Sequence, residues 1–241
     1  IAGKWAWPRS THAEVLEGLQ SIKPKTISFD ILFPERDVYR PDADTYFNEV
    51  IAEFTNVFLP MMVIDGKGNK LTSKEMKMLP LVSVPKAINV NVPNLLLPRA
   101  IDSSLWQLGA INYQADSDGV GRFYEYQTVK YGWEIYSLPA VVFNASAASG
   151  VIPKSALLKW KGDVNFPYKT LSYAQVYQAI QAGDLDYLNQ FRGKHVFIGA
   201  TAAGLYDERV TPTNKNLPGV YVLATALDNL LNNDFYRVSP I

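Results

Sequence analysis

The segment Thr26-Ile27-Ser28-Phe29-Asp30-Ile31-Leu32-Phe33 predicts a buried β-strand near the start of the chain. It is rich in β-branched and aromatic residues, it is short, and Pro24 and Pro34 bound it. This pattern is typical of a strand that is buried on both faces of a sheet. The segment is therefore predicted to be the first strand in an alternation of helices and strands.

Helical signals lie on both sides of this strand. Upstream, Thr11-His12-Ala13-Glu14 fits a capping box at the start of a helix of about three turns, which Pro24 ends. Downstream, apolar residues recur with a period near 3.6 from Pro41 to Phe54, which predicts a second helix. The apolar run Val57–Ile64 follows it.

The last third of the chain repeats the strand, loop and helix order. His195-Val196-Phe197-Ile198-Gly199 predicts a buried strand, and the loop Ala200–Gly204 follows it. Pro218-Gly219 then introduces apolar residues at helical spacing, up to Asn232-Asn233.

The middle of the chain is less regular. Residues 109–113 and 120–129 flank Asp116-Ser117-Asp118-Gly119, which predicts an antiparallel hairpin because an acidic residue and a glycine suit its turn. Residues 65–105 contain several prolines and predict an irregular excursion. We expect one α/β domain over residues 1–241, with a mixed, mostly parallel sheet flanked by helices and an antiparallel hairpin. The alternative is a domain boundary near residue 65 or 105.

Composition excludes several classes of protein. The 241 residues are 48% hydrophobic and carry 23 basic and 23 acidic side chains, so the formal net charge is zero. Without a basic cluster, nucleic-acid binding is not expected. The absence of cysteine excludes disulfides, thiolate metal sites and cysteine nucleophiles. No apolar stretch approaches the roughly 18 residues that cross a bilayer, so we expect any membrane segments to lie outside this sequence.

The sequence predicts no metal and no cofactor. His12 and His195 are the two histidines, and neither has the closely spaced second histidine of a metal site. The glycine-containing loop 199–204 follows a strand, as phosphate-binding loops do, but Thr201 stands where a dinucleotide fingerprint needs glycine. We interpret this loop as a tight strand exit, with contact to a small ligand as the alternative.

Asp30 is the best single acidic candidate for a site. It lies at the end of a predicted strand, and ligands of open α/β sheets bind at the carboxyl ends of strands. The alternative is that Asp30 caps the following turn at Pro34-Glu35. Asp116 and Asp118 are interpreted as turn residues because they adjoin Gly119.

Six segments together resemble a known family, in the right order and over nearly the whole chain. They are Trp5–His12, Ile27–Asp37, Gly109–Arg122, Val196–Asp207, Thr211–Val220 and Ala226–Leu231. The sequence is similar to the second type of CHASE domain, the cyclase- and histidine-kinase-associated sensory extracellular domain.

The resemblance implies a non-catalytic sensory domain on the periplasmic or extracellular face of the bacterial inner membrane, within a membrane-anchored receptor. It further implies an output such as a nucleotide cyclase, a histidine kinase or a serine/threonine kinase. One departure stands out. Where relatives often have His and Asn, this chain has Leu223 and Thr225, so any use of those polar side chains is in doubt here.

The resulting hypothesis is that a small molecule, an ion or a periplasmic partner binds near the strand ends and changes how the domain packs against a second copy, as in a homodimer. The candidate ligand-binding residues are Asp30, Gly199, Ala200, Thr201 and Asp207. Arg9 and Arg122 are secondary candidates, with ion pairing inside the fold as the favoured interpretation. Two alternatives stay open: a metal-dependent hydrolase or phosphoryl-transfer enzyme that uses Asp30 and Asp207, and a structural dimerisation spacer.

Overall fold

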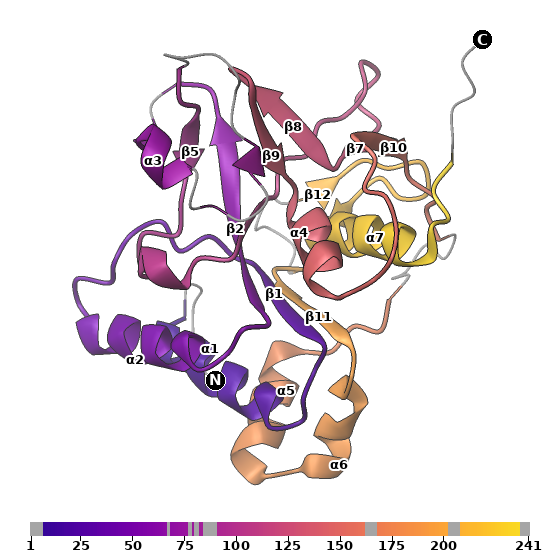
Figure 1. The fold of residues 1–241 in the computed structure, drawn as a ribbon. Coiled ribbons are helices and arrows are strands. Elements are labelled where there is room, and N and C mark those ends of the chain that lie inside the picture. The colour runs from indigo at the N-terminus through magenta and orange to yellow at the C-terminus, as the bar shows by residue number, and fades with distance from the viewer. Residues whose placement is uncertain are drawn as a thin grey trace.

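The chain folds around one mixed sheet that is flanked by helices (Figure 1). The computed structural model describes residues 7–66, 68–76, 79, 82–83, 91–161, 168–201 and 208–236. The predicted fold class, an α/β fold with a mostly parallel sheet and an antiparallel hairpin, is confirmed.

The main sheet has the strand order β11-β1-β2-β5-β3, and β6 also pairs with β2. These strands are β1 (Thr26–Asp30), β2 (Val57–Ile64), β3 (Asn69–Lys70), β5 (Asn94–Leu96), β6 (Leu108–Ala110) and β11 (His195–Gly199). β1 is parallel to both of its neighbours, and β6 is parallel to β2. The carboxyl ends of β1 and β11 therefore meet at one edge, where Asp30 is opposite Gly199.

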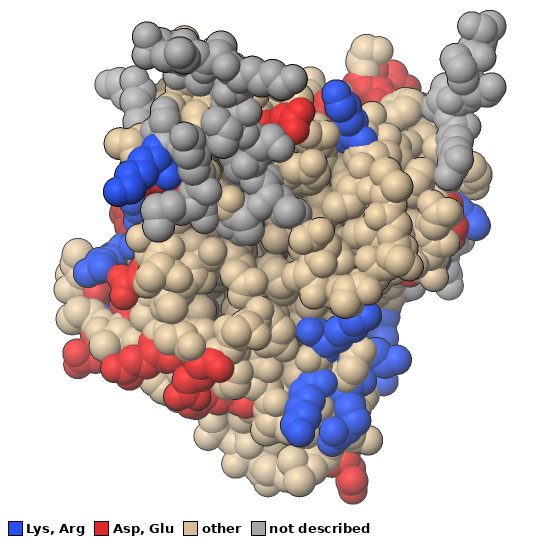
Figure 2. Space-filling model, in the orientation of Figure 1, with Lys and Arg blue, Asp and Glu red and all other residues tan. Residues whose placement is uncertain are grey.

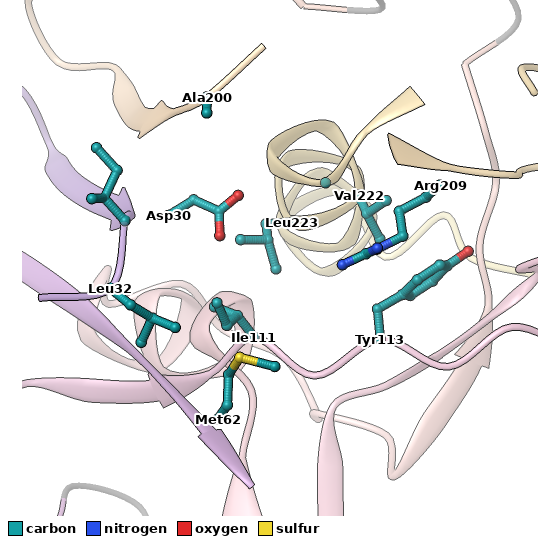
Figure 3. Close-up of a pocket in the computed structure, with 11 residues that line it drawn as sticks. Asp30, Leu32, Met62, Ile111, Tyr113, Ala200, Arg209, Val222 and Leu223 are labelled. Atoms are coloured by element: carbon teal, nitrogen blue, oxygen red, sulfur yellow. The ribbon is translucent and has the colours of Figure 1, made fainter. Parts of the chain in front are cut away.

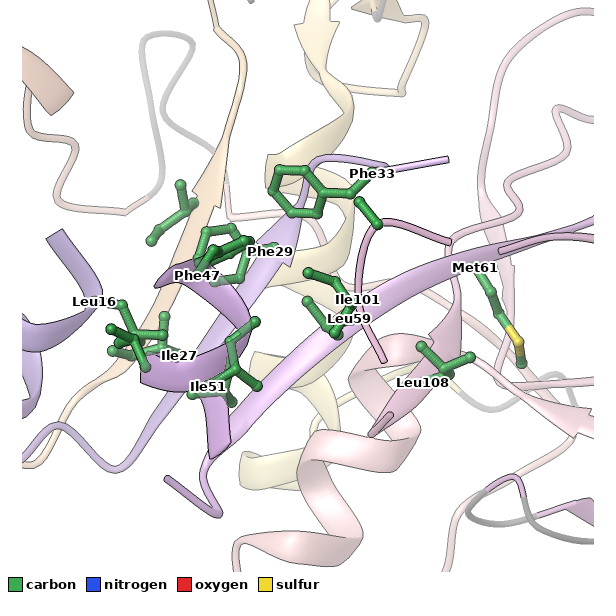
Figure 4. Packing of buried hydrophobic residues seen from close by; sticks show 14 of the residues in the cluster. Leu16, Ile27, Phe29, Phe33, Phe47, Ile51, Leu59, Met61, Ile101 and Leu108 are labelled. Carbon is green, nitrogen blue, oxygen red and sulfur yellow. The ribbon is translucent and has the colours of Figure 1, made fainter. Parts of the chain in front are cut away.

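One face of the sheet is covered by α1 (Arg9–Gln20), α2 (Pro41–Ala52) and α5 (Tyr173–Ala182). Ile27 and Phe29 of β1 are fully buried and belong to the same hydrophobic cluster as Leu16, Phe47 and Ile51 of these helices (Figure 4). The predicted helix of residues 41–54 is thus confirmed, two residues shorter at its end.

The other face is covered by α4 (Leu138–Ala145) and α7 (Gly219–Asn232). Side chains alternate between the two faces along a strand. Phe58 and Phe197 pack in the cluster of α4 and α7, whereas their neighbours Leu59 and Ile198 belong to the first cluster. Burial on both faces explains why the strand sequences are almost continuously apolar.

The remaining described elements are short. They are α3 (Ser73–Met76), α6 (Leu185–Leu188), the 3-10 turns η1 (Ser103–Leu105) and η2 (Asn189–Phe191), and the antiparallel strands β4 (Val82–Ser83), β7 (Phe123–Glu125), β8 (Gln127–Lys130), β9 (Trp133–Tyr136), β10 (Ser155–Leu157), β12 (Glu208–Arg209) and β13 (Leu217–Pro218). β8 and β9 form a hairpin that β4 extends, β7 pairs with β10, and β12 pairs with β13.

The hairpin is not where the sequence predicted it. The turn itself is present, because the Gly119 amide donates to the Asp116 carbonyl and Gly119 has a φ of 82°. The flanking strands do not pair with each other, however: β6 joins β2 of the main sheet and β7 joins β10. The turn was identified correctly, and the partners of its strands were not.

Two further local predictions need correction. The region of residues 65–105 was expected to lie outside the regular structure, yet β5 and β3 extend the main sheet, and Leu95 and Leu97 are fully buried. The helix expected to begin at Thr11 begins at Arg9 with Pro8 at the N-cap and has no side-chain cap. The fixed φ of proline makes Pro8 a suitable place to begin, so Thr11 lies inside the first turns.

Charged side chains on the described surface gather in separate groups (Figure 2). Exposed acidic residues lie on and after α2, including Asp42, Glu49 and Glu53, and exposed basic residues lie around the start of β11, including Lys25 and Lys194. In the part of the chain that the structure describes, none of the helices is long and apolar enough to span a bilayer.

Candidate functional site

A cavity of about 330 Å³ opens where the carboxyl ends of β1 and β11 meet the first turns of α7 (Figure 3). Its lining combines one acidic, one basic and one phenolic side chain with an apolar floor. The lining residues are Asp30, Ile31, Leu32, Met62, Ile111, Tyr113, Ala200, Arg209, Gly219, Val222 and Leu223.

The position of this cavity follows from the connections that leave β1 and β11. β1 continues into α2 on one face, whereas β11 leads towards α7 on the other face. Neighbouring parallel strands whose connections leave on opposite faces create a crevice outside their carboxyl ends, which is the usual ligand site of open α/β sheets. The cavity occupies this crevice.

Asp30 and Ala200 enter the cavity from the ends of these two strands. Gly199 does not line it but allows it to form. A Cβ atom on Gly199 would lie 2.7 Å from Cβ of Val220 in the first turn of α7 and 3.2 Å from Cβ of Asp30. Glycine therefore lets the amino end of α7 approach the end of β11.

We expect Gly199→Ala to lower the free energy of unfolding by about 1–3 kcal/mol, because the added methyl group overpacks the contact with Val220. Urea unfolding of the purified chain measures this. The matched control repeats the substitution in a Val220→Gly background, which lacks both Val220 atoms that the added methyl group would meet, and there Gly199→Ala should cost less than in the parent chain. A single variant as stable as the parent chain would contradict the close approach of α7.

The opposite wall of the cavity is formed by Tyr113 and Arg209. Tyr113 follows β6, and Arg209 lies in β12, whose pairing with β13 (Arg209 opposite Leu217) puts it directly beside the start of α7. Burial, aided by the negative charge of Asp116, raises the pKa of Tyr113 to about 12, against the opposing effect of Arg209. Tyr113 is therefore a neutral phenol at physiological pH. Its hydroxyl is buried and forms no hydrogen bond within the described residues.

The floor of the cavity is apolar. Leu32, Met62, Ile111, Val222 and Leu223 supply it. Figure 3 shows Leu223 between the two charged groups and Leu32, Ile111 and Met62 below them. Of Leu223 and Thr225, the two positions singled out in the sequence, Leu223 lines the cavity. Thr225 is fully buried in α7 and is not among the lining residues.

The other predicted site residues lie elsewhere. Thr201 is exposed next to the cavity, and Asp207 lies outside the described residues. The Arg9 Nε atom is 3.0 Å from Asp44 Oδ1, and Arg122 contacts Asp116 at 2.9 Å and Asp118 at 2.8 Å. Neither arginine lines the cavity, and both form ion pairs within the fold.

A second hollow, of about 560 Å³, lies beside α2. Several of its charged side chains already contact one another or a neighbour: Arg40 lies 2.9 Å from Asp37, and Arg36 lies 3.5 Å from Asp102. This hollow lies along a helix and not at the strand ends. Among the described residues there is also no group of three or more His, Cys, Asp or Glu side chains that could hold a metal ion.

Sequence reasoning missed Tyr113 and Arg209. Tyr113 follows the parallel strand β6, but its segment was assigned to a hairpin, so the rule for strand ends that selected Asp30 was not applied to it. Arg209 comes to the site through the two-residue pairing of β12 with β13. No local signal in the sequence announces such a pairing.

Comparison with known proteins identifies the family of this chain. Searches of curated proteins and of solved structures found no match. The family model of the CHASE2 domain matches residues 1–240. This match covers all of the segments on which the resemblance was based. The chain therefore belongs to the CHASE2 domain family, whose members are extracellular sensory domains of signalling receptors.

Proposed function

We propose that this domain senses a small molecule in the cavity between β1, β11 and α7, on the periplasmic or extracellular side of the inner membrane. It does so as part of a membrane-anchored bacterial receptor whose output is a nucleotide cyclase or a kinase. The observation that carries the proposal is the cavity itself, which combines convergent polar groups with an apolar floor at the usual ligand position of such sheets.

The position of α7 supports a route from binding to signalling. Residues of its first two turns line the cavity, and further along the Tyr126 hydroxyl donates to the Ala226 carbonyl at 2.9 Å. The Asn229 amide exchanges hydrogen bonds with the Lys159 backbone at 2.8 and 3.2 Å. A ligand that favours one position of α7 therefore also affects the segments that are hydrogen-bonded to this helix. Binding alters the packing of a homodimer if the ligand has a higher affinity for one arrangement of the two copies.

Ligand binding is expected to raise the melting temperature of the purified chain. A ligand at 100 times its dissociation constant stabilises by about 2.7 kcal/mol, which corresponds to roughly 5–10 °C for a domain of this size. The measurement is a thermal-shift panel of carboxylates, amines, amino acids, monosaccharides, nucleotides, inorganic phosphate and divalent cations. Asp30→Ala should abolish the shift, which is measured relative to the melting temperature of the same variant without ligand.

The control is Asp186→Ala, which removes an exposed carboxylate from α6, outside the cavity lining, and should keep the full shift. In a full-length receptor, Asp30→Ala should likewise abolish the response to the stabilising compound. A panel without any stabilising class would favour a dimerisation spacer. Turnover of phosphate or ester substrates that is lost in Asp30→Ala would favour the enzyme.

A further inference from the structure

The two ends of the cavity carry opposite charges. Asp30 enters from the end of β1, and Arg209 enters from β12. In Figure 3 the carboxyl group and the guanidinium group point into the cavity from opposite sides, with Leu223 in view between them. Such a cavity has a pole suited to a cation and a separate pole suited to an anion, joined by an apolar surface.

The pole at Arg209 has a second source of positive potential. Gly219, the first residue of α7, lines the cavity, and the N-cap residue Pro218 provides no side-chain cap. The amides of the first helical turn lack acceptors within the helix, and the helix dipole favours an anion there. Arg209 is held beside this helix end because Glu208 is opposite Pro218. A carboxylate at this pole would meet a guanidinium fork and backbone amides together.

The ring of Tyr113 forms part of the wall at the same pole, and its hydroxyl points away from Asp30 and lies against Gly121 (Figure 3). This hydroxyl is buried and forms no hydrogen bond within the described residues, and a Cβ atom on Gly121 would overlap it. Glycine at position 121 thus leaves room for this ring position.

The size and the floor of the cavity limit the rest of the ligand. A volume of about 330 Å³ is at the lower end of the range for ligand pockets, which begins near 300 Å³. Leu32, Met62, Ile111 and Leu223 offer a small aliphatic body an apolar surface. Sugars and nucleotides, which need many polar partners, fit this floor poorly.

We infer that the ligand is a small aliphatic zwitterion of the amino-acid type, with its ammonium group at Asp30 and its carboxylate at Arg209 and the start of α7. This inference rests on the proposed sensory function and names the chemical class that it takes. A ligand with only one of these charged groups would leave either Asp30 or Arg209 without a complementary charge from the ligand.

The first test is a matched series of compounds on the unaltered chain, measured by isothermal titration calorimetry. One series is L-leucine, 4-methylpentanoate without the amine, and 3-methylbutylamine without the carboxylate. The other is 5-aminopentanoate, pentanoate and butylamine, in which the two charges are at opposite ends. In at least one series the zwitterion should bind about 10- to 100-fold more tightly than both single-charge analogues, because charged hydrogen bonds are lost with either group.

The second test uses variants. Asp30→Asn should weaken the zwitterion about 10-fold or more and leave the matching carboxylate unchanged, whereas Arg209→Gln should weaken both compounds. The controls are Asp186→Asn and Arg192→Gln, which alter exposed side chains outside the lining and should bind as the parent does.

The results separate the two proposals. Binding of pentanoate or 4-methylpentanoate as tight as that of its zwitterion overturns the zwitterion and leaves the sensory function intact. The zwitterion is also overturned, and the sensory function left intact, if neither zwitterion binds but a compound of another class stabilises the chain in the thermal-shift panel. Absence of any stabilising compound overturns both. Because the compound series uses the unaltered chain, a variant that fails to fold cannot obscure the outcome.

Discussion

Replacing Gly109 with alanine is expected to lower the free energy of unfolding by about 3 kcal/mol or more, at or above the upper end of the usual cost of overpacking. Gly109 lies in the middle of β6, opposite Pro60 of β2, and a Cβ atom there would lie 2.6 Å from the backbone nitrogen of Leu138 and closer still to its Cα. The obstacle is the backbone of α4 and not a flexible side chain.

The start of α4 has little freedom to retreat. The Ser137 amide donates to the Tyr126 carbonyl at 2.9 Å, and the Ser137 hydroxyl accepts a hydrogen bond from the Ala140 amide as the N-cap. An isolated parallel bridge also joins Ser137 to Ala110. An added methyl group must therefore displace the whole helix, together with its packing against α7.

Urea unfolding followed by circular dichroism measures the effect. The control is Gly150→Ala: Gly150 is exposed, and the nearest atom to its added Cβ is the ring tip of Phe143 at 3.0 Å. This variant should be within about 1 kcal/mol of the parent chain. A Gly109→Ala chain with the same stability as the control would contradict the packing of α4 on β6.

The elements with strong local signals could be predicted from the sequence. The strand predicted at residues 26–33 is present over 26–30, and the one predicted at 195–199 is present there; both were recognised as short apolar runs. The helix predicted at 41–54 is present over 41–52, and the one after Pro218 over 219–232; both were recognised from apolar periodicity and from proline or glycine near their ends. These signals act over a few residues, so no knowledge of the rest of the chain was needed.

Pairing between distant strands could not be predicted in the same way. The turn at Asp116–Gly119 is a strong local signal, and it suggested that its two flanking strands pair with each other. Instead β6 pairs with β2, about 50 residues earlier in the chain, and α4 packs closely on it at Gly109. Which neighbour a strand chooses depends on tertiary packing that no single segment encodes.

The residues of the candidate site also fall into those that the sequence predicted and those that it did not. Asp30 and Ala200 follow predictable parallel strands, and the structure places both in the lining of the cavity. Tyr113 and Arg209 complete that lining, but their positions depend on the pairing of β6 with β2 and of β12 with β13. The acidic pole could therefore be anticipated from the sequence, and the basic pole could not.

Acid is expected to destabilise the domain through His12. This histidine is 2% exposed and lies among the rings of Phe29, Phe33 and Phe47, and its Nδ1 atom is 2.8 Å from the Tyr173 hydroxyl. Burial first, and then the positive charge of Arg9, lowers its pKa from 6.5 to about 4. The folded chain therefore resists a proton that the unfolded chain accepts below pH 6.5.

The direction of the effect follows from this difference. The stability due to neutral His12 is fully present above pH 6.5 and is lost as the pH falls through 4, because the unfolded state binds more protons between these values. The loss amounts to about 3 kcal/mol between pH 7 and pH 4. His195, whose pKa burial and Lys25 also lower to about 4, acts in the same direction, but it is only half-buried and should contribute less.

Urea titration at pH 7, 6, 5 and 4.5 tests this expectation. It measures the free energy of unfolding of the parent chain, of His12→Phe and of His195→Asn. His12→Phe keeps an aromatic ring in the cluster and removes the titration, so its dependence on pH over this range should be smaller by up to one proton, about 1.4 kcal/mol per pH unit. Comparing the variants cancels the carboxylates, which titrate in all three chains. Equal slopes for the parent and His12→Phe, or a pKa near 6.5 for His12 in the NMR spectrum of the folded chain, would show that water reaches this ring and that the cluster around it is open.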